Sequence, residues 1–327
     1  MLELERQAAF VKDAANEAAL TALHTQLAPL HAELVAHYAH ATPPLVFVIG
    51  MARSGTTLAS QLCAASGFAS VSNFVARFWQ VPTAGALIEK LVLKPVVAMT
   101  SSFRSEHGVT EGWAEPHEFG YFWDRWFDLG QDSHQLDAAA LARVDARALQ
   151  RELAAIQAIA GRPLVCKNNT WCSLQAGFLA QLFPGAVFVV CRREPKWIAQ
   201  SLLQGRITRY GSREAWWSIR PASYPRLKTQ PWPAQIAGQI ADFEKAMDSE
   251  LKRVNPSRIV EAPYVEVCRD PAQVISRVFD ALRATGSDFI ADLARLPQGF
   301  TSTDRQQISD DDWRALNDAL NCLLPTI

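Results

Sequence analysis

The sequence predicts an α/β fold of three layers, in which helices cover both faces of a central parallel sheet. Three observations predict it. Short apolar runs rich in β-branched residues recur along the chain, as in strands that are buried on both faces. Stretches with helical periodicity separate these runs, and strands that alternate with helices form parallel sheets. The 327 residues, 49% of them hydrophobic, suffice for a large core.

The first 41 residues are expected to form an N-terminal helical segment. One apolar stripe follows steps of three and four residues, through Leu20, Leu23, Leu27, Leu30 and Leu34. The stripe predicts a helix, bent at Pro29, that packs on the body of the domain. The alternative is a helix that pairs with its copy, so a monomer and a homodimer both stay open.

Four predicted strands follow, at residues 45–49, 163–166, 186–191 and 258–260. Predicted helices lie at residues 57–65, 141–159, 174–182, 197–203 and 236–254. No internal repeat and no low-complexity linker interrupts this series, so residues 1–327 are expected to form a single domain.

Two aromatic-rich insertions of low periodicity interrupt the alternation of strands and helices. They are residues 100–135, with Trp113, Trp123 and Trp126, and residues 205–233, with Trp216, Trp217 and Trp232. Insertions on α/β scaffolds tend to form lids and pockets at the carboxyl ends of strands. The alternative is a set of satellite hydrophobic clusters beneath long loops.

Composition excludes several classes of protein. With 32 basic and 33 acidic residues the net charge is −1, so no nucleic-acid partner is expected from bulk charge. The longest apolar runs are too short to span a membrane, and no secretory leader is visible at the N-terminus. The six cysteines are scattered without zinc-binding spacing, which predicts no metal site and buried thiols in a reducing cytoplasm.

The most specific local pattern is residues 50–58, Gly-Met-Ala-Arg-Ser-Gly-Thr-Thr-Leu, between a predicted strand and a predicted helix. In that position backbone N–H groups converge, and the helix N-terminus adds partial positive charge. Gly55 lets the backbone approach an anion, and the hydroxyl groups of Ser54, Thr56 and Thr57 are further donors. The pattern predicts a phosphate-binding loop; the alternative is an ordinary helix N-terminus rich in Ser and Thr.

The spacing from Gly50 to Gly55 matches the start of a nucleoside-triphosphate P-loop, but Thr56 replaces the lysine that should follow. That lysine reaches the β- and γ-phosphates, so its absence argues against an ATPase or a GTPase. The carboxylate that normally supports the magnesium ion is also missing, because two predicted strands are followed by Lys167 and Arg192 and not by Asp. The loop is therefore expected to bind an anion with Arg53 and without an obligatory metal.

Residues 53–57, Arg-Ser-Gly-Thr-Thr, resemble the loop with which one family of sulfotransferases binds a 5′-phosphosulfate. These enzymes use 3′-phosphoadenosine 5′-phosphosulfate (PAPS). Their second motif is a buried strand followed by Arg, with Ser eight residues later, and Arg193 and Ser201 have that spacing. Further similarity lies at residues 166–169 with 183–186, and at Tyr264 with Asp270-Pro271. The resemblance spans about residues 45–280.

The resemblance implies a P-loop-NTPase-like fold and transfer of a sulfuryl group from PAPS, which leaves 3′-phosphoadenosine 5′-phosphate (PAP). It implies that residues 53–57 bind the 5′-phosphosulfate and that Arg193 with Ser201 binds the 3′-phosphate. The similarity at Tyr264 with Asp270-Pro271 implies that Tyr264 also belongs to the site that binds PAPS. Lys167 is expected to neutralise the leaving group from the carboxyl end of its strand.

The general base departs from the family pattern. Relatives place a Glu or a His at positions that Asn73 and Asn169 occupy here, and an amide cannot take a proton. The candidates are Glu118 and His117, with Glu115 behind them, in an aromatic segment where burial raises a carboxyl pKa. The alternative is a cluster at the start of a helix. Arg77 is expected either to contact substrate or to pair with one of these acids.

A local excess of basic residues between 192 and 228 is expected to attract an anionic cofactor, although most of these side chains taken singly suit a solvated face. The aromatic insertions favour a small apolar or aromatic acceptor over a polysaccharide. Two alternatives to a sulfotransferase remain. One is a P-loop kinase of a small metabolite, and the other is a catalytically silent homologue that keeps the nucleotide site.

Overall fold

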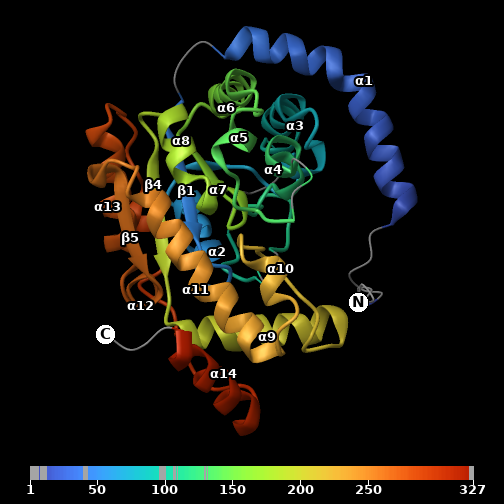
Figure 1. The fold of residues 1–327 in the computed structure, drawn as a ribbon. Coiled ribbons are helices and arrows are strands. Elements are labelled where there is room, and N and C mark those ends of the chain that lie inside the picture. The colour runs from blue at the N-terminus through green and yellow to red at the C-terminus, as the bar shows by residue number, and fades with distance from the viewer. Residues whose placement is uncertain are drawn as a thin grey trace.

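The carboxyl ends of five parallel strands form the edge on which the site is built. The computed structural model describes residues 7, 13–39, 43–95, 101–105, 108, 110–128, 130 and 132–323. Its sheet has the strand order β2-β3-β1-β4-β5, with all neighbours parallel (Figure 1). The strands are β1 (Leu45–Gly50), β2 (Ala69–Ser70), β3 (Leu164–Lys167), β4 (Val187–Arg192) and β5 (Ile259–Pro263). The predicted α/β class with a parallel sheet is confirmed.

Helices account for most of the remaining described chain. The α-helices of the first half are α1 (Ala14–Tyr38), α2 (Thr56–Ala65), α3 (Pro82–Ile88), α4 (Gly120–Phe127), α5 (Ala138–Leu141) and α6 (Ala146–Ala160). Those of the second half are α7 (Trp171–Leu174), α8 (Ala176–Leu182), α9 (Pro195–Tyr210), α10 (Tyr224–Leu227), α11 (Trp232–Leu251), α12 (Tyr264–Arg269), α13 (Pro271–Ala284) and α14 (Asp310–Leu323). Short 3-10 or π turns are η2 (Val75–Phe78), η3 (Glu89–Leu93), η4 (Pro256–Arg258) and η5 (Leu293–Arg295).

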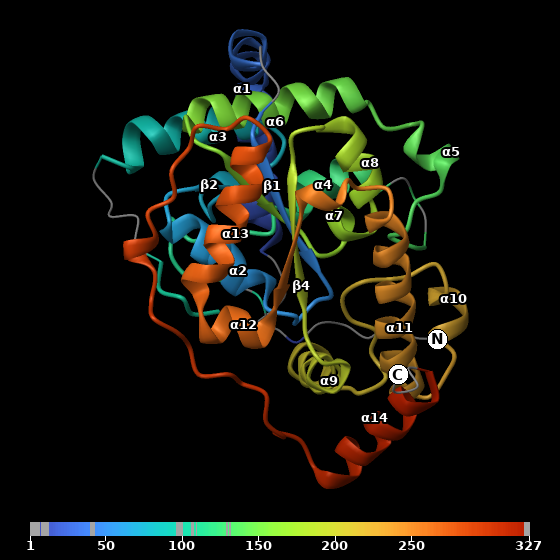
Figure 2. The same ribbon diagram turned by 90° about the vertical axis from the view of Figure 1, so that its left-hand side faces the viewer.

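The three layers follow from alternation along each strand. Leu45, Phe47 and Ile49 of β1 join one hydrophobic cluster, and Val46 and Val48 join the other. Helices α2 and α13 cover the second face, whereas α7, α8 and α11 cover the first (Figure 2). Both faces of the strand are buried, which explains its continuous apolar sequence.

Differences from the predicted elements have local causes. The predicted helix at residues 141–159 begins only at Ala146 of α6, because the Asp145 carboxylate caps that helix; Leu141 is instead the last residue of the short helix α5. Strand β2 was not predicted, since two residues are too short for a periodic signal. Helix α9 is longer than predicted, with Pro195 at its first position.

Helix α1 packs on the body of the domain. Leu34 is buried against Phe78 and Val81, and Leu27 is partly buried beside them. The predicted stripe is not buried as a whole, because Leu23 and Leu30 are 42% and 39% exposed. Two histidines take part in the contact instead: His24 bonds to the carbonyl of Arg77 at 2.8 Å, and His31 pairs with Glu152 at 2.8 Å.

The first aromatic insertion supplies core as well as surface. Phe122, Trp123 and Phe127 of α4 are buried in the main hydrophobic cluster, whereas Trp113 is 63% exposed.

Five of the six free cysteines are buried, and burial raises the pKa of the Cys63 and Cys166 thiols to about 12. The expectation of a buried thiol is wrong for Cys322, which is exposed in the last turn of α14.

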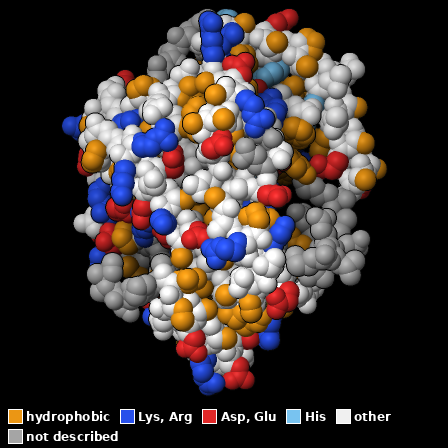
Figure 3. Space-filling model, in the orientation of Figure 1, with side chains coloured by type: hydrophobic (Ala, Val, Ile, Leu, Met, Phe, Trp, Pro, Cys, Tyr) orange, Lys and Arg blue, Asp and Glu red, His pale blue; other side chains and the backbone are white. Residues whose placement is uncertain are grey.

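The surface carries charges of both signs. On the face seen in Figure 3, basic and acidic side chains lie interspersed. Across the described ranges, no helix is long and apolar enough to cross a bilayer. The predicted absence of a leader concerns residues 1–6, which lie outside the described residues, and so does Thr42 at the predicted end of the N-terminal helical region.

Candidate functional site

The loop between β1 and α2 has the backbone shape of an anion cradle. Gly50, Arg53 and Gly55 have φ angles of 142°, 75° and 98°. A Cβ on Gly50 would lie 2.4 Å from the carbonyl oxygen of Cys191, so the loop start requires glycine. Arg53 adopts the left-handed region without being glycine, a strained conformation that clusters at functional sites.

Polar side chains that follow β3 hold this loop from behind. The amide of Asn169 donates to the carbonyls of Gly50 and Met51, both at 3.2 Å, and contacts the Thr56 hydroxyl at 3.0 Å. Ser173 accepts a bond from the Gly50 N–H at 3.1 Å. Asn169, which takes the place of a catalytic histidine in the resemblance, therefore fixes the loop.

The first turn of α2 opens onto a cavity. No side chain within the described part of the chain caps this helix, whose N-cap residue is Gly55. The N–H groups of a first helical turn have no partner inside the helix and carry partial positive charge. Thr56 and Thr57 line the cavity at this turn, as an anion site requires.

Gly55 and Tyr264 meet at the same loop. A Cβ on Gly55 would lie 2.8 Å from Cδ2 of the Tyr264 ring, so glycine is needed for this contact. Ser54 is different from its neighbours, because its side chain is fully buried and its N–H donates to the Met51 carbonyl at 3.1 Å. The structure does not bring Ser54 to the cavity.

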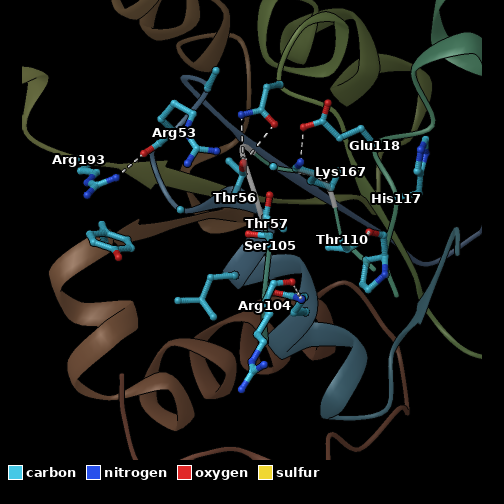
Figure 4. A pocket seen from close by; sticks show the side chains of 18 of the residues that line it. Arg53, Thr56, Thr57, Arg104, Ser105, Thr110, His117, Glu118, Lys167 and Arg193 are labelled. Atoms are coloured by element: carbon cyan, nitrogen blue, oxygen red, sulfur yellow. Dashed lines mark hydrogen bonds and ion pairs between the residues drawn. The ribbon is translucent and has the colours of Figure 1, made fainter. Parts of the chain in front are cut away.

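The two predicted phosphate motifs are joined directly. The Arg53 Nε donates to the Ser201 hydroxyl at 2.7 Å. The Arg193 Nη1 donates to the Arg53 carbonyl at 2.9 Å (Figure 4). The Arg193 guanidinium also lies over the Tyr264 ring, 4.3 Å from its centroid. Burial, and then the nearby Arg193, lower the pKa of Arg53 from its ordinary value.

The loop, the strand ends and the first aromatic insertion surround a cavity of about 680 Å³. Among its described lining side chains one is a carboxylate, that of Glu118, and five are cationic: Arg53, Arg104, Lys167, Arg193 and Arg209. An adjoining cavity of about 630 Å³ shares Arg53 and Arg193 and contains Ser201. The second cavity adds one described carboxylate, that of Asp312, so cationic side chains outnumber carboxylates in the lining of both cavities together, in a protein whose net charge is −1.

Lys167 and Glu118 form an ion pair inside the cavity (Figure 4). The lysine side chain is 3% exposed at the end of β3, and the glutamate side chain is 44% exposed. Asn168 fixes the backbone of Glu118, because its amide donates to the Glu118 carbonyl at 3.2 Å. Its oxygen accepts a bond from the N–H of Trp171 at 2.7 Å, which anchors it to α7.

The other candidates for a general base have different surroundings. His117 lines the cavity, but its Nδ1 accepts a bond from the Phe119 N–H at 2.8 Å. A neutral ring with that bond carries its proton on Nε2, which makes Nε2 a donor. Glu115 is buried and accepts bonds from Gln61 and from Ser101 at 2.9 and 3.1 Å, so it ties segments together.

Asn73, which replaces a base of the family pattern, and Arg77, the predicted partner of substrate or of an acid, are not among the residues that line the cavity. The Asn73 amide donates to the carbonyls of Thr110 and Gly112, at 3.0 and 2.8 Å. Arg77 lies 3.8 Å from Glu17 of α1 and pairs with neither Glu115 nor Glu118 among its described contacts.

The basic run between residues 192 and 228 is not one patch. Arg192 pairs with Glu244, Asp248 and Glu261, and Arg213 pairs with Asp312 at 3.0 Å. Arg206 is fully buried, and burial lowers its pKa to about 10. Arg193 and Arg209 line the cavity, whereas Arg192 does not.

A segment near the C-terminus completes the site and was missed from the sequence. Thr301 and Thr303 line the cavity, and the Thr303 hydroxyl lies 3.1 Å from the Tyr264 hydroxyl. Asp304 forms an ion pair with Arg193 at 2.5 Å. These residues lie beyond the resembling span and follow no motif, so no local pattern marks them.

Comparison with known families gives one match over most of the chain. A family model described as the sulfotransferase family matches residues 44–288. No curated protein matches the chain.

Among solved structures the chain is similar to several sulfotransferases. Sulfotransferase STF9 from Mycobacterium avium is 17% identical, with a TM-score of 0.48, over 93% of this chain and 73% of that one. Sulfotransferase STF1 from Mycobacterium tuberculosis H37Rv is 15% identical, with a TM-score of 0.48, over 93% and 82%. The sulfotransferase domain of the Synechococcus PCC 7002 olefin synthase is 18% identical, with a TM-score of 0.39, over 88% and 91%.

Proposed function

The chain belongs to the sulfotransferase family, and on that premise we propose that it transfers a sulfuryl group from PAPS to a hydroxyl or amine of a small acceptor. The observation that carries the proposal is the direct link between the two anion motifs. Because Arg53 bonds to Ser201 and Arg193 bonds to the Arg53 backbone, the loop and the Arg193 subsite adjoin. One bisphosphorylated nucleoside can therefore span them.

The donor's charge fits the cationic lining. A nucleotide with a 5′-phosphosulfate and a 3′-phosphate carries about four negative charges, and arginine forks suit such oxyanions. The first-turn N–H groups of α2 with Arg53, Thr56 and Thr57 would hold the 5′ end. Arg193 and Ser201 would hold the 3′-phosphate, with Tyr264 against the loop.

Lys167 and Glu118 would carry the chemical step. The acceptor oxygen or nitrogen forms a bond to sulfur while the bond from sulfur to the bridging phosphate oxygen breaks. The electron pair leaves with PAP, whose new charge Lys167 neutralises, and the acceptor proton passes to the Glu118 carboxylate. Lys167 and Arg53 supply positive charge at this point, so the proposed step needs no metal ion.

The acceptor would enter beside Glu118. Pro116, His117 and Gly120 line this part of the cavity, and Phe103 and Trp217 add apolar walls elsewhere in it. Apolar and aromatic walls favour a small apolar or aromatic acceptor over a long anionic sugar.

Ligand-dependent thermal unfolding tests the proposal. A ligand at a hundredfold excess over its Kd stabilises the native state by about 2.7 kcal/mol, so PAP at that excess should raise the Tm by more than ADP or ATP with Mg²⁺ at the same concentration. Arg53→Ala and Arg193→Ala should lose the shift. Arg314→Ala, in an exposed pair with Asp311, should keep it. A shift with ATP and Mg²⁺ alone would instead favour a kinase.

Transfer of labelled sulfate from PAPS to a panel of phenols, alcohols and amines then separates an enzyme from a silent homologue. Binding of PAP with no transfer to any acceptor would favour the silent homologue.

A further inference from the structure

The guanidinium of Arg193 is almost completely occupied by groups of the protein itself. Its Nε donates to Asp304 at 2.7 Å, and its Nη2 lies 2.5 Å from the same oxygen and donates to Thr303 at 2.9 Å. Its Nη1 donates to the Arg53 carbonyl at 2.9 Å. A guanidinium has five N–H groups, so these contacts leave one for a ligand.

Asp304 is held in place by its segment. The neighbouring Thr303 hydroxyl lies 3.1 Å from the Tyr264 hydroxyl. Gln200 of α9 donates to the Arg305 carbonyl at 3.0 Å and accepts from the Gln307 N–H at 2.7 Å. The Asp304 side chain is 14% exposed. Its pairing with Arg193 is therefore part of the packed structure and not a contact of a free surface side chain.

The pair conflicts with the role proposed for Arg193. A phosphate binds an arginine best through two parallel N–H bonds. In Arg193 the Nε and Nη2 groups could donate such a pair of bonds, but both already contact the Asp304 carboxylate. A carboxylate next to a phosphate dianion is also repelled, and such like-charge contacts are costly. Both anions cannot use this edge of the guanidinium at once.

We propose that Asp304 is a specificity-determining residue of the donor site, whose carboxylate competes with the 3′-phosphate for the guanidinium of Arg193. This inference rests on the proposed function. PAPS and PAP share the 3′-phosphate, so Asp304 weakens the binding of both and favours release of the product. It also reduces the advantage of 3′-phosphorylated nucleotides over those that lack the 3′-phosphate. The opposite role, in which Asp304 only orients Arg193, predicts that its loss weakens binding.

Calorimetric titration of the full chain with PAP and with AMP tests the competition. Asp304→Asn keeps the size of the side chain and removes its charge, so it should tighten PAP binding by about tenfold or more. AMP lacks the 3′-phosphate, and its affinity should change by less than about twofold. Asp304→Ser is the second variant, and an unchanged circular dichroism spectrum shows that each variant folds. Asp292→Asn removes an exposed carboxylate paired with Arg295 and should alter neither affinity.

Three results would overturn the inference while PAP still binds the unaltered protein. They are weaker PAP binding by both Asp304 variants, unchanged PAP binding, and an equal gain for PAP and AMP. Failure of the unaltered protein to bind PAP at all would instead overturn the proposed function, so the two failures are distinguishable.

Discussion

At the residue scale, the surroundings of two carboxylates three positions apart separate their roles. Glu118 is 44% exposed in the cavity beside Lys167, where an acceptor can reach it. Glu115 is 4% exposed and surrounded by donors, which include Gln61 and Ser101. A base needs an accessible lone pair, and Glu118 has the more accessible carboxylate.

Replacing Glu118 by Gln should lower kcat by about 10² to 10⁴, because an amide of the same size cannot accept the acceptor proton. The Kd for PAP should stay within about threefold, since the donor contacts lie on other residues. Steady-state kinetics with a confirmed acceptor and titration with PAP measure the two effects.

The matched control is Glu115→Gln. It should cost roughly 1 to 3 kcal/mol of stability, because buried donors lose a charged acceptor, and should leave kcat of the folded protein nearly unchanged. A Glu118→Gln enzyme as fast as the unaltered one would place the base elsewhere.

At the element scale, helix α9 shapes the cavity through a glycine. A Cβ on Gly205 would lie 1.9 Å from Cζ3 of Trp217, so the indole rests directly on the helix backbone. Trp217 lines the cavity, and the Arg209 guanidinium lies 5.2 Å from its ring centroid. The position of the Trp217 ring therefore depends on the absence of a side chain at Gly205, one helical turn before Arg209 in α9.

Gly205→Ala should push the Trp217 ring away and lower the free energy of unfolding by about 1 to 3 kcal/mol, the usual cost of overpacking. Urea denaturation measures this change. Gly120→Ala is the control, because its added Cβ would meet no other side chain within 4 Å among the described residues, and it should be neutral or slightly stabilising. Equal unfolding free energies for the two variants would mean that the indole moves without cost.

The elements that could be predicted are those whose signal is local. The run at residues 45–49 is buried on both faces, so its sequence is apolar throughout, and β1 appears where expected. The loop with Arg53 and Gly55 carries its own pattern, because a tight anion cradle restricts the residues that can form it. The carboxyl ends of parallel strands share one edge, so the position of Lys167 at the end of β3, in the lining of the cavity, could be predicted, whereas its role stays a prediction.

Elements and contacts without a local signal could not be predicted. The role of Asn169 depends on the Gly50 and Met51 carbonyls, more than a hundred residues earlier. Asp304 meets Arg193 across a similar separation. Such contacts join residues that are distant in the sequence, so neither composition nor periodicity near either residue indicates its partner.

At the scale of the whole molecule, hydrogen bonds tie together segments that are far apart in the sequence. His134 is central to one of these ties. The backbone N–H of Arg220 donates to Nδ1 of His134 at 3.0 Å, and the backbone N–H of His134 donates to the Arg220 carbonyl at 2.8 Å. The Gln175 amide donates to its carbonyl at 2.8 Å, which links the first insertion, the second insertion and α8.

His134 should make the whole protein sensitive to acid. Burial, and then the nearby Arg220, lower its pKa from 6.5 to about 3. Between these values the unfolded chain binds a proton that the folded chain does not, so stability is complete above pH 6.5 and is lost as pH falls toward 3. From pH 7 to pH 5 this one group should cost about 2 kcal/mol, measured by urea denaturation at both values.

His134→Gln should be less stable at pH 7, since it disturbs the bonds to Arg220, but it should lose about 2 kcal/mol less than the unaltered protein on going to pH 5. The difference between the two proteins isolates His134, because every other titrating group is common to both. If the unaltered protein and His134→Gln lose stability in parallel, the imidazole is protonated in the folded state as readily as in the unfolded chain, and Arg220 does not oppose its charge.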